Sequence, residues 1–344
     1  MIRLVWVIVL LATFSHTVAA RCWKTSRGII VSVEEGRACA MEAFQGTPDG
    51  TAGYADMLNS WRTRLDTAIR LWNIIVPTSA SFLLPDESKG LSAPQHPVIL
   101  QAYASVGKGV ETVDVWDTLS AHAQEPIYAR TDHHWLPLGA YYAARTFAAK
   151  AGVLIPDTAD YERLVIRRFN GTMGRWSGSS LVRNTTEDFV WYRPTDSVQI
   201  ATTYLNHHSA RGQVTVSGEP YGGSFFLPRR DGSSSAYSTF MNGDARTTLV
   251  RYAAASNQRR LLIIKDSYGN AFASFLLRSF AEVHVVDFRY FQGNILDYIR
   301  RAGITDVLVI NNLQHAYNPS TPVKILRLLE APSTGVEEVI FAVK

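Results

Sequence analysis

The chain has 344 residues, of which 47% are apolar, and its formal net charge at pH 7 is +4. This apolar content is enough for a sizeable core in one large domain or two small ones, so intrinsic disorder is not expected. Nucleic acid is not an expected partner, because the sequence has no concentrated run of lysine and arginine and no recognisable binding module. The mild positive excess would suit an anionic polymer as substrate.

The first 20 residues have the pattern of a secretory signal peptide. Arg3 precedes a compact apolar run over 4–12, and Val18 and Ala20 are the small residues that a signal peptidase requires. Because this run is short for a bilayer span, cleavage after Ala20 is favoured, with an uncleaved N-terminal anchor as the alternative. We therefore expect a protein that is exported across the cytoplasmic membrane.

Cys22 and Cys39 lie in 21–50, the expected N-terminal segment of the mature chain. In an exported protein we expect them to form a disulfide that staples a hairpin, with a stabilisation of roughly 3 kcal/mol. A catalytic thiol is the weaker alternative, because neither cysteine lies next to a histidine or in a strand-to-helix turn.

The next part of the chain alternates helical and strand patterns. Apolar periodicity predicts helices over 54–70 and 136–152, and short apolar runs predict strands over 71–76 and 110–115. Pro137 suits the first turn of the second helix, and Gly152 suits its C-terminal end.

Residues from about 164 to 245 have a different composition. Glycine, serine, threonine and aromatic residues dominate there, and no long helical pattern is present. We expect β-hairpins and loops that are inserted into the main sheet or lie over it. Such loops often line a binding cleft, although they can also serve only to cover a sheet.

The C-terminal part carries the clearest fold signal. Strands are predicted over 261–265, 283–287 and 306–310, and helices over 268–280 and 294–302. This alternation predicts an α/β fold with a parallel sheet, in a single domain over 51–344. Ligands of such sheets bind beyond the C-terminal ends of the strands, and Ser267, Arg289 and Asn311 all follow a strand.

Three residues are suited to a serine acyl-transfer site. Ser267 stands where a strand turns into a helix, so its hydroxyl would be exposed beside the free amides of the first helical turn. His134 would accept the serine proton, and Asp132 would hold the other imidazole nitrogen. A plain helix-capping role for Ser267 stays open, and the chain has no GxSxG motif.

If the segment 131–135 is extended, Asp132 and His134 share a face and His133 points away. A metal site built from these three residues is the rival interpretation. Consecutive histidines rarely reach one ion, and no HExxH motif or cysteine cluster completes a ligand shell. We therefore expect no metal.

Several segments together carry a resemblance to a known family. They are YARTDHHWLPLGAYY at 128–142, KDSYGNAF at 265–272, VDFRYF at 286–291, and the stretches 54–59 and 76–79. In this order they resemble the DHHW family of exported bacterial proteins, which are of the SGNH-hydrolase type, over nearly the whole mature chain. The family is similar to the periplasmic alginate O-acetylation proteins, which carry Asp-x-His and a late serine in the same order.

The resemblance implies an SGNH-hydrolase-like parallel sheet flanked by helices, with a motif order that looks like a circular permutation. It implies Ser267 as nucleophile, His134 as base and Asp132 as the residue that orients the base. The implied reaction passes an acetyl group through an acyl-serine to a hydroxyl of an exopolysaccharide or cell-envelope polysaccharide in the periplasm. In related systems a membrane-bound O-acyltransferase supplies the acetyl group, and no cofactor is implied.

The resemblance also suggests further site residues. SGNH enzymes use the serine amide, a glycine amide and an asparagine side chain for the oxyanion, so Gly243 and Asn311 are candidates, although Gly243 could equally belong to a hairpin turn. Arg289 and Tyr268 are candidates for substrate binding, and anchoring of a sheet-end loop is the alternative for Arg289.

Two other functions stay open. A carbohydrate acetyl-esterase would use the same residues, with water in place of the sugar, and a polysaccharide-binding scaffold would use none of them catalytically. The enzyme interpretations predict the Ser267 oxygen at about 2.6–3.2 Å from a nitrogen of His134, with Asp132 on the other nitrogen. The scaffold interpretation predicts that these groups lie apart.

Overall fold

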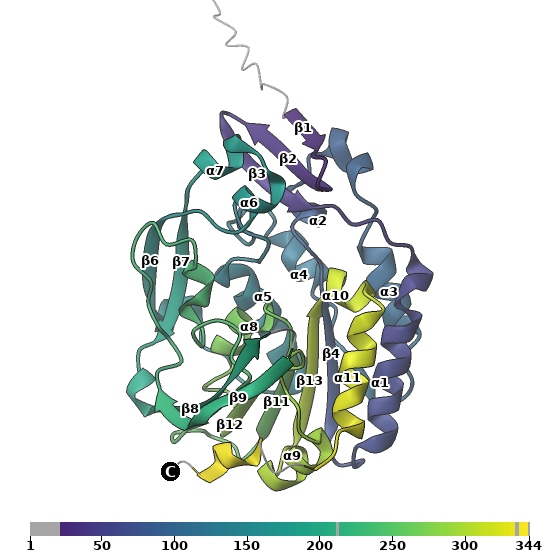
Figure 1. Cartoon of the computed structure of the whole chain (residues 1–344), viewed down its shortest axis with the longest axis vertical. Coiled ribbons are helices and arrows are strands. Elements are labelled where there is room, and N and C mark those ends of the chain that lie inside the picture. Colours follow the sequence, from purple (N-terminus) through teal and green to yellow (C-terminus); the bar gives the residue numbers. More distant parts are fainter. Residues whose placement is uncertain (1–20, 211–212, 334–336, 343–344) are drawn as a thin grey trace, which may run out of the picture.

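The computed structural model describes residues 21–210, 213–333 and 337–342, and the expected signal peptide over 1–20 lies outside this part. The described chain folds around an eight-stranded mixed sheet with helices on both faces (Figure 1). From one edge to the other, the strands are β5 (Val110–Thr112), β4 (Arg70–Val76), β13 (Asp306–Asn312), β11 (Arg260–Lys265), β12 (Glu282–Asp287), β10 (Thr247–Tyr252), β8 (Ile200–Ala210) and β9 (Gln213–Gly223). The first five are parallel, and the last three are joined to them and to each other by antiparallel pairing.

The two faces of the sheet carry separate apolar cores, because successive side chains of a strand point to opposite faces. On β11, Leu261 and Ile263 pack in one core, and Leu262 and Ile264 pack in the other. The first core is covered by α5 (Pro137–Ala151) and α8 (Gly269–Ser274), and the second by α1 (Ala52–Arg64), α3 (His96–Ala104), α9 (Ile295–Ala302) and α11 (Ser320–Glu330). Burial on both faces explains why the parallel strands are continuous apolar runs in the sequence.

The α/β fold class expected from the sequence is confirmed. The helix predicted over 136–152 is α5, which ends where Gly152 adopts a left-handed φ of 67°. The helix predicted over 268–280 is shorter than expected, because α8 ends at Ser274. Beyond Ser274 the chain continues in turns, one of which is closed by the hydrogen bond from the N–H of Leu276 to the carbonyl of Ala273 (3.0 Å). The apolar residues of these turns are spaced as they would be in a helix.

The β-rich insertion contains two separate structures. β6 (Tyr161–Phe169) and β7 (Glu187–Pro194) form a two-stranded sheet, with α6 (Met173–Ser177) and α7 (Ser180–Asn184) between them in the chain. β8 and β9 instead extend the main sheet. Both arrangements that the sequence left open therefore occur, because β8 and β9 are inserted into the sheet and β6 and β7 pack over its first core.

An antiparallel sheet of β1 (Arg21–Lys24), β2 (Ile29–Glu34) and β3 (Arg37–Glu42) precedes the main fold. In Figure 1 it lies beyond the C-terminal ends of the parallel strands, beside α6 and α7. The backbone N–H of Ala40 in β3 donates to the carbonyl of Arg130 at 2.9 Å. The N-terminal sheet is thus joined directly to the segment that leads into the two histidines.

The expected disulfide between Cys22 and Cys39 is wrong, since both are free cysteines. Cys22 in β1 and Cys39 in β3 pair with the same residue, Ser32 of the intervening strand β2. Two strand spacings amount to roughly 9–10 Å, and a disulfide requires Cα atoms less than about 7 Å apart. The sequence suggested a two-stranded hairpin, and the third strand separates the thiols.

The remaining described α-helices are short: α2 (Ala80–Leu83), α4 (Trp116–Ala121) and α10 (Leu313–Tyr317). α10 follows β13 directly, at the edge of the sheet where the parallel strands end. Across the described ranges, no helix combines the length and the apolarity that a membrane crossing requires.

Candidate active site

Ser267, His134 and Asp132 form a continuous hydrogen-bonded chain, called here the Ser–His–Asp chain. Ser267 lies in the turn between β11 and α8, at the C-terminal edge of the parallel strands. Its Oγ lies 2.7 Å from Nε2 of His134, and Nδ1 of His134 lies 2.6 Å from Oδ1 of Asp132. The geometry expected of an acyl-transfer site is therefore present, although 133 residues separate the serine from the histidine.

The segment that carries His134 is held against the serine turn by Trp135. Tyr128 and Trp135 form an antiparallel bridge that closes the segment into a loop. The buried indole of Trp135 donates from Nε1 to the carbonyl of Tyr268 at 3.1 Å and to the hydroxyl of Tyr237 at 3.2 Å. Tyr237 also stacks on the His134 ring, with centroids 3.7 Å apart. These contacts fix the imidazole relative to Ser267.

Asp132 is buried, and each of its oxygens has partners. Oδ1 accepts the backbone N–H of His134 as well as facing its ring, and Oδ2 accepts from the backbone N–H (2.9 Å) and the hydroxyl (3.0 Å) of Thr172. Burial alone would raise the pKa of this carboxyl, but the charge and hydrogen bond of His134 outweigh it and hold the pKa below its usual value. Asp132 is therefore an ionised partner for a protonated imidazole.

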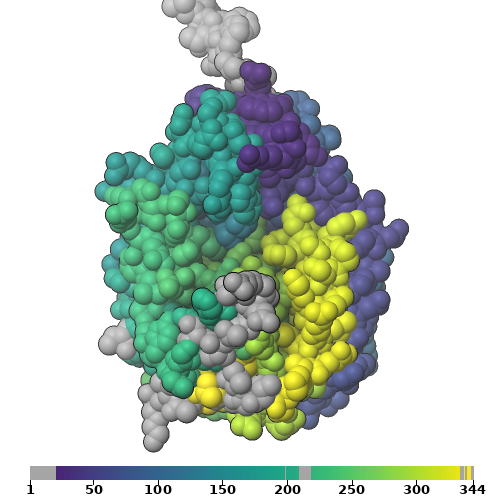
Figure 2. Space-filling view, in the orientation of Figure 1, coloured from purple at the N-terminus to yellow at the C-terminus, as the bar shows by residue number. Residues whose placement is uncertain are grey.

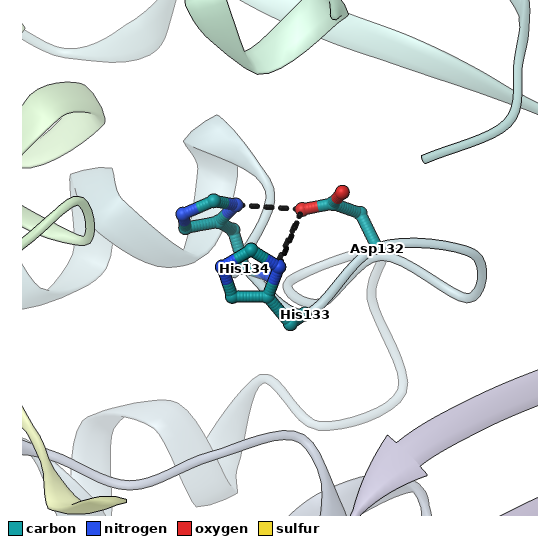
Figure 3. A group of neighbouring side chains, drawn as sticks. All are labelled: Asp132, His133 and His134. Carbon is teal, nitrogen blue, oxygen red and sulfur yellow. Dashed lines mark hydrogen bonds and ion pairs between the residues drawn. The ribbon is translucent and has the colours of Figure 1, made fainter. Parts of the chain in front are cut away.

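His133 does not point away from Asp132, as the extended-segment expectation required (Figure 3). The chain bends through this segment, so the rings of His133 and His134 lie 3.7 Å apart and both face the same carboxylate. Burial, followed by the charge of His134, lowers the pKa of His133 to about 3. His133 also stacks on Trp176 with centroids 4.5 Å apart, so it is a neutral packing residue between His134 and α6.

Asp132, His133 and His134 offer ligand atoms within 4.8 Å of one another, a spacing that would suit a metal ion. The Nδ1 atoms are engaged, however: that of His133 lies 2.9 Å from the hydroxyl of Thr172, and that of His134 faces Asp132. Nε2 of His134 faces Ser267. Hydrogen bonding alone therefore accounts for the arrangement.

The sequence reasoning missed a second imidazole–carboxylate pair at the serine turn. Asp266, directly before Ser267, is fully buried and accepts the backbone N–H of Tyr268 at 2.9 Å and that of Asn312 at 2.8 Å. Nδ1 of His315, in α10, lies 2.8 Å from Oδ2 of Asp266. The sequence did hold a signal for this pair: His315 comes just after the strand predicted over 306–310, which ends at the same edge of the sheet as Ser267.

The structure gives the proposed oxyanion residues other roles. The N–H of Gly243 donates to the carbonyl of Phe240 at 2.9 Å, in a turn where the φ of Gly243 is 99°. This turn lies between β9 and β10, which are not neighbours in the described sheet, so it is not a hairpin turn. The carboxamide of Asn311 is buried, with its oxygen accepting from Tyr54 at 2.9 Å. Within the described ranges, no hydrogen bond engages the backbone N–H of Ser267, which leaves that amide as an oxyanion donor.

The two substrate-binding candidates are also engaged elsewhere. The guanidinium of Arg289 forms ion pairs with Asp287 (2.6 Å) and Asp244 (2.9 Å), which anchor the loop after β12. Burial opposes the charged form of Arg289, but these carboxylates raise its pKa further. Tyr268 is fully buried, and its hydroxyl donates to the carbonyl of His133. Both residues thus make structural contacts at the site, and a contact of either with substrate stays a prediction.

The surface is hollowed between the green residues of the insertion and the yellow C-terminal helices (Figure 2). A separate cavity of about 710 Å³ lies beside the histidine segment. Its lining includes Tyr128, Arg130 and Leu136, on either side of that segment, but no member of the Ser–His–Asp chain. Glu187 in its wall accepts the backbone N–H of Arg130 at 2.9 Å. We therefore locate the candidate site by its hydrogen bonds and not by this cavity.

Comparison with known proteins supports both the fold and the family. The chain matches the DHHW protein family over residues 31–205. Its structure is similar to that of a DHHW family protein from Eubacterium siraeum, with 31% sequence identity, a TM-score of 0.79, and coverage of 92% of this chain and 99% of the other. No curated protein matches the chain.

Two further solved structures match the chain at lower sequence identity. Bacillus cereus PatB1 with a sulfonyl adduct has 17% identity and a TM-score of 0.64, with coverage of 84% of this chain and 96% of PatB1. The O-acetyltransferase domain of Pseudomonas putida AlgJ has 13% identity and a TM-score of 0.45, with coverage of 90% and 99%. The α/β architecture that the sequence predicts, a parallel sheet flanked by helices, is confirmed by the strand pairing, and PatB1 shares this fold.

Proposed function

This chain belongs to the DHHW family, and we propose that it is an exported serine O-acetyltransferase acting on an exopolysaccharide or cell-envelope polysaccharide. One observation carries the proposal: Ser267, His134 and Asp132 are joined by two hydrogen bonds of 2.7 Å and 2.6 Å. A scaffold protein has no need of an imidazole poised between a serine hydroxyl and a buried carboxylate. The preference for transfer over hydrolysis comes from the resemblance of the motifs to polysaccharide O-acetylation proteins.

In the first half-reaction, Oγ of Ser267 attacks the carbonyl carbon of an acetyl ester while Nε2 of His134 takes the serine proton. The tetrahedral intermediate collapses when its bond to the donor oxygen breaks, and His134 gives the proton to the departing alcohol. Asp132 stabilises the imidazolium that forms in between. The free N–H of Ser267 supports the developing oxyanion.

In the second half-reaction, a sugar hydroxyl attacks the acetyl-serine carbonyl and gives its proton to His134. The bond between the acetyl carbon and Oγ of Ser267 then breaks, and His134 returns the proton to the serine. The product is an acetylated sugar, and the enzyme is restored. We propose that a membrane-bound O-acyltransferase supplies the acetyl group and that the reaction takes place in the periplasm.

The test is release of acetate from p-nitrophenyl acetate by the protein, with and without an oligosaccharide acceptor. The Ser267→Ala variant should lose the acetyl-enzyme and the acetylated sugar, whereas Ser60→Ala, on α1, should behave as the wild type. Acetate release that no acceptor changes would identify an esterase instead. Absence of an acetyl-serine in the wild-type protein would reject both enzyme functions and favour the scaffold.

A further inference from the structure

The Asp266–His315 pair lies immediately beside the nucleophile. Asp266 precedes Ser267 in the chain, and Nδ1 of His315 lies 2.8 Å from Oδ2 of Asp266. The same oxygen accepts the backbone N–H of Asn312 at 2.8 Å. The end of β13 and the start of α10 are therefore tied to the serine turn through one buried carboxylate.

This pairing determines which nitrogen of His315 is free. Nδ1 faces the carboxylate, and within the described residues no hydrogen bond engages Nε2. The side chain of His315 is 33% exposed, so Nε2 is accessible on the outer side of the ring. Burial alone would lower the pKa of His315, but the hydrogen bond and charge of Asp266 raise it. Asp266 thus favours the protonated ring relative to a free imidazole, and in the protonated ring Nε2 carries an outward N–H donor.

The carboxyl of Glu42 is near enough to both His134 and His315 for their charges to affect its pKa. Glu42 ends β3 of the N-terminal sheet, and its carboxyl pKa is raised by burial and lowered by the charges of both His134 and His315. His134 and His315 therefore both lie within electrostatic range of the Glu42 carboxyl. His315 also stands at the C-terminal edge of the parallel strands, where ligands of α/β sheets bind.

We propose that His315 binds the acceptor sugar, by donating a hydrogen bond from Nε2 to a sugar oxygen beside Ser267. This inference rests on the proposed function. His134 moves the protons, and His315, oriented by Asp266, holds the attacking sugar near the acetyl-serine. A transferase needs such a group, because a positioned sugar hydroxyl must outcompete water at the acyl carbon.

Two substitutions separate the functions of the two ring nitrogens. His315→Asn keeps an amide N–H close to the position of Nδ1, and so the contact to Asp266, but removes the outward donor. His315→Gln carries an N–H close to the position of Nε2. The control is His96→Gln, because His96 is a partly exposed histidine that pairs with Asp114 (2.9 Å) on a different part of the fold.

The measurement is the ratio of acetyl transfer to acetate release from p-nitrophenyl acetate, with cellopentaose as neutral acceptor and pentamannuronate as acidic acceptor. We expect His315→Asn to lower this ratio by about tenfold or more and to raise the KM for the acceptor, because the hydrogen bond to the acceptor is lost. His315→Gln should recover part of the ratio, and His96→Gln should match the wild type. A larger loss with pentamannuronate would indicate that His315 binds a sugar carboxylate.

An unchanged ratio in His315→Asn, or an equal fall of acylation and transfer, would overturn the proposal in favour of a structural role. Calorimetric binding of both oligosaccharides to Ser267→Ala, with and without His315→Asn, tests the same contact without chemistry. Loss of affinity there supports acceptor binding even if no acetyl-serine forms, and unchanged affinity or no binding of either sugar rejects it. Failure of the proposed function and failure of this inference are thus distinguishable.

Discussion

A side chain at Gly171 would overlap the carboxylate of Asp132. An ideal Cβ atom there would collide with Oδ2 and Cβ of Asp132. The backbone of 171–172 passes this close because the N–H and hydroxyl of Thr172 both donate to Oδ2. The insertion between β6 and β7 thus holds the carboxylate that orients His134.

Gly171→Ala should therefore displace Asp132 and lengthen its bond to His134. We expect kcat to fall by about 100-fold, since misplacement of a catalytic group by about 1 Å has effects of this size. Acetate release from p-nitrophenyl acetate measures the loss. Gly90→Ala is the matched control, because a Cβ at Gly90 meets no atom within 4 Å. Equal activity of the two variants would show that a glycine at 171 is not needed to position Asp132.

Asp132→Asn should leave the fold in place and remove most of the activity. An amide cannot stabilise the imidazolium, and it favours the wrong tautomer of His134. We expect kcat to fall by about 10⁴-fold, as for the same change in another Ser–His–Asp enzyme. Steady-state kinetics with circular dichroism of the same sample separates lost chemistry from lost structure. Activity within a few fold of the wild type would argue against Asp132 as the orienting group.

The stability that Asp132 contributes should depend on pH. Its pKa in the folded protein lies below the usual aspartate value of 3.8, because the charge and hydrogen bond of His134 outweigh burial. A group with a lowered pKa stabilises the fold above its unfolded pKa and loses that contribution as pH falls through the folded pKa. The Tm difference between wild type and Asp132→Asn should therefore stay constant near neutral pH and shrink only as the pH falls below 3.8, towards the folded pKa. A difference that stays constant below this pH as well would contradict the assignment.

Trp135→Phe should lower activity as well as stability. It removes the Nε1 donor that binds the Tyr268 carbonyl at 3.1 Å, and so loosens the histidine segment from the serine turn. We expect the hydrogen bond itself to be worth about 1 kcal/mol. Trp61→Phe is the control for lost volume, because Trp61 is fully buried and its Nε1 has no hydrogen-bond partner among the described residues. Only Trp135→Phe should raise the ratio of unreacted to acetylated Ser267.

The two cysteines should behave as free thiols of unequal reactivity. Burial raises the pKa of Cys39 to about 12, so its thiolate is scarce, whereas Cys22 is partly exposed. In the folded protein without reductant, a thiol reagent should label Cys22 and reach Cys39 only after denaturation. Cys22→Ser and Cys39→Ser identify each thiol. A Tm that falls on addition of dithiothreitol would show that a disulfide forms after all.

The sequence by itself located the residues of the Ser–His–Asp chain through local chemistry. A carboxylate two residues before a histidine and a serine after an apolar strand are short-range signals, and the strand–helix alternation predicted that Ser267 lies at the C-terminal edge of a parallel sheet. The catalytic roles remain predictions, but the hydrogen bonds that they require are present.

Local rules failed where a polar group had more than one possible partner. Asn311 does follow a strand at the expected edge, yet its carboxamide is buried against Tyr54. Arg289 also lies at that edge, and two carboxylates engage its guanidinium. Which partner a side chain takes depends on segments that are distant in sequence, so periodicity and spacing cannot predict it.

The sequence alone determined the α/β class, the alternation of strands and helices in the C-terminal part, and the position of Ser267 after a strand. These features follow from apolar periodicity and short motifs. Only the tertiary structure decided that β2 separates Cys22 from Cys39, that His133 and His134 share one carboxylate, and that His315 reaches Asp266. The physical reason is the same in each case. Strand order, chain bends and contacts between distant segments are set by packing of the whole domain, which no local pattern encodes.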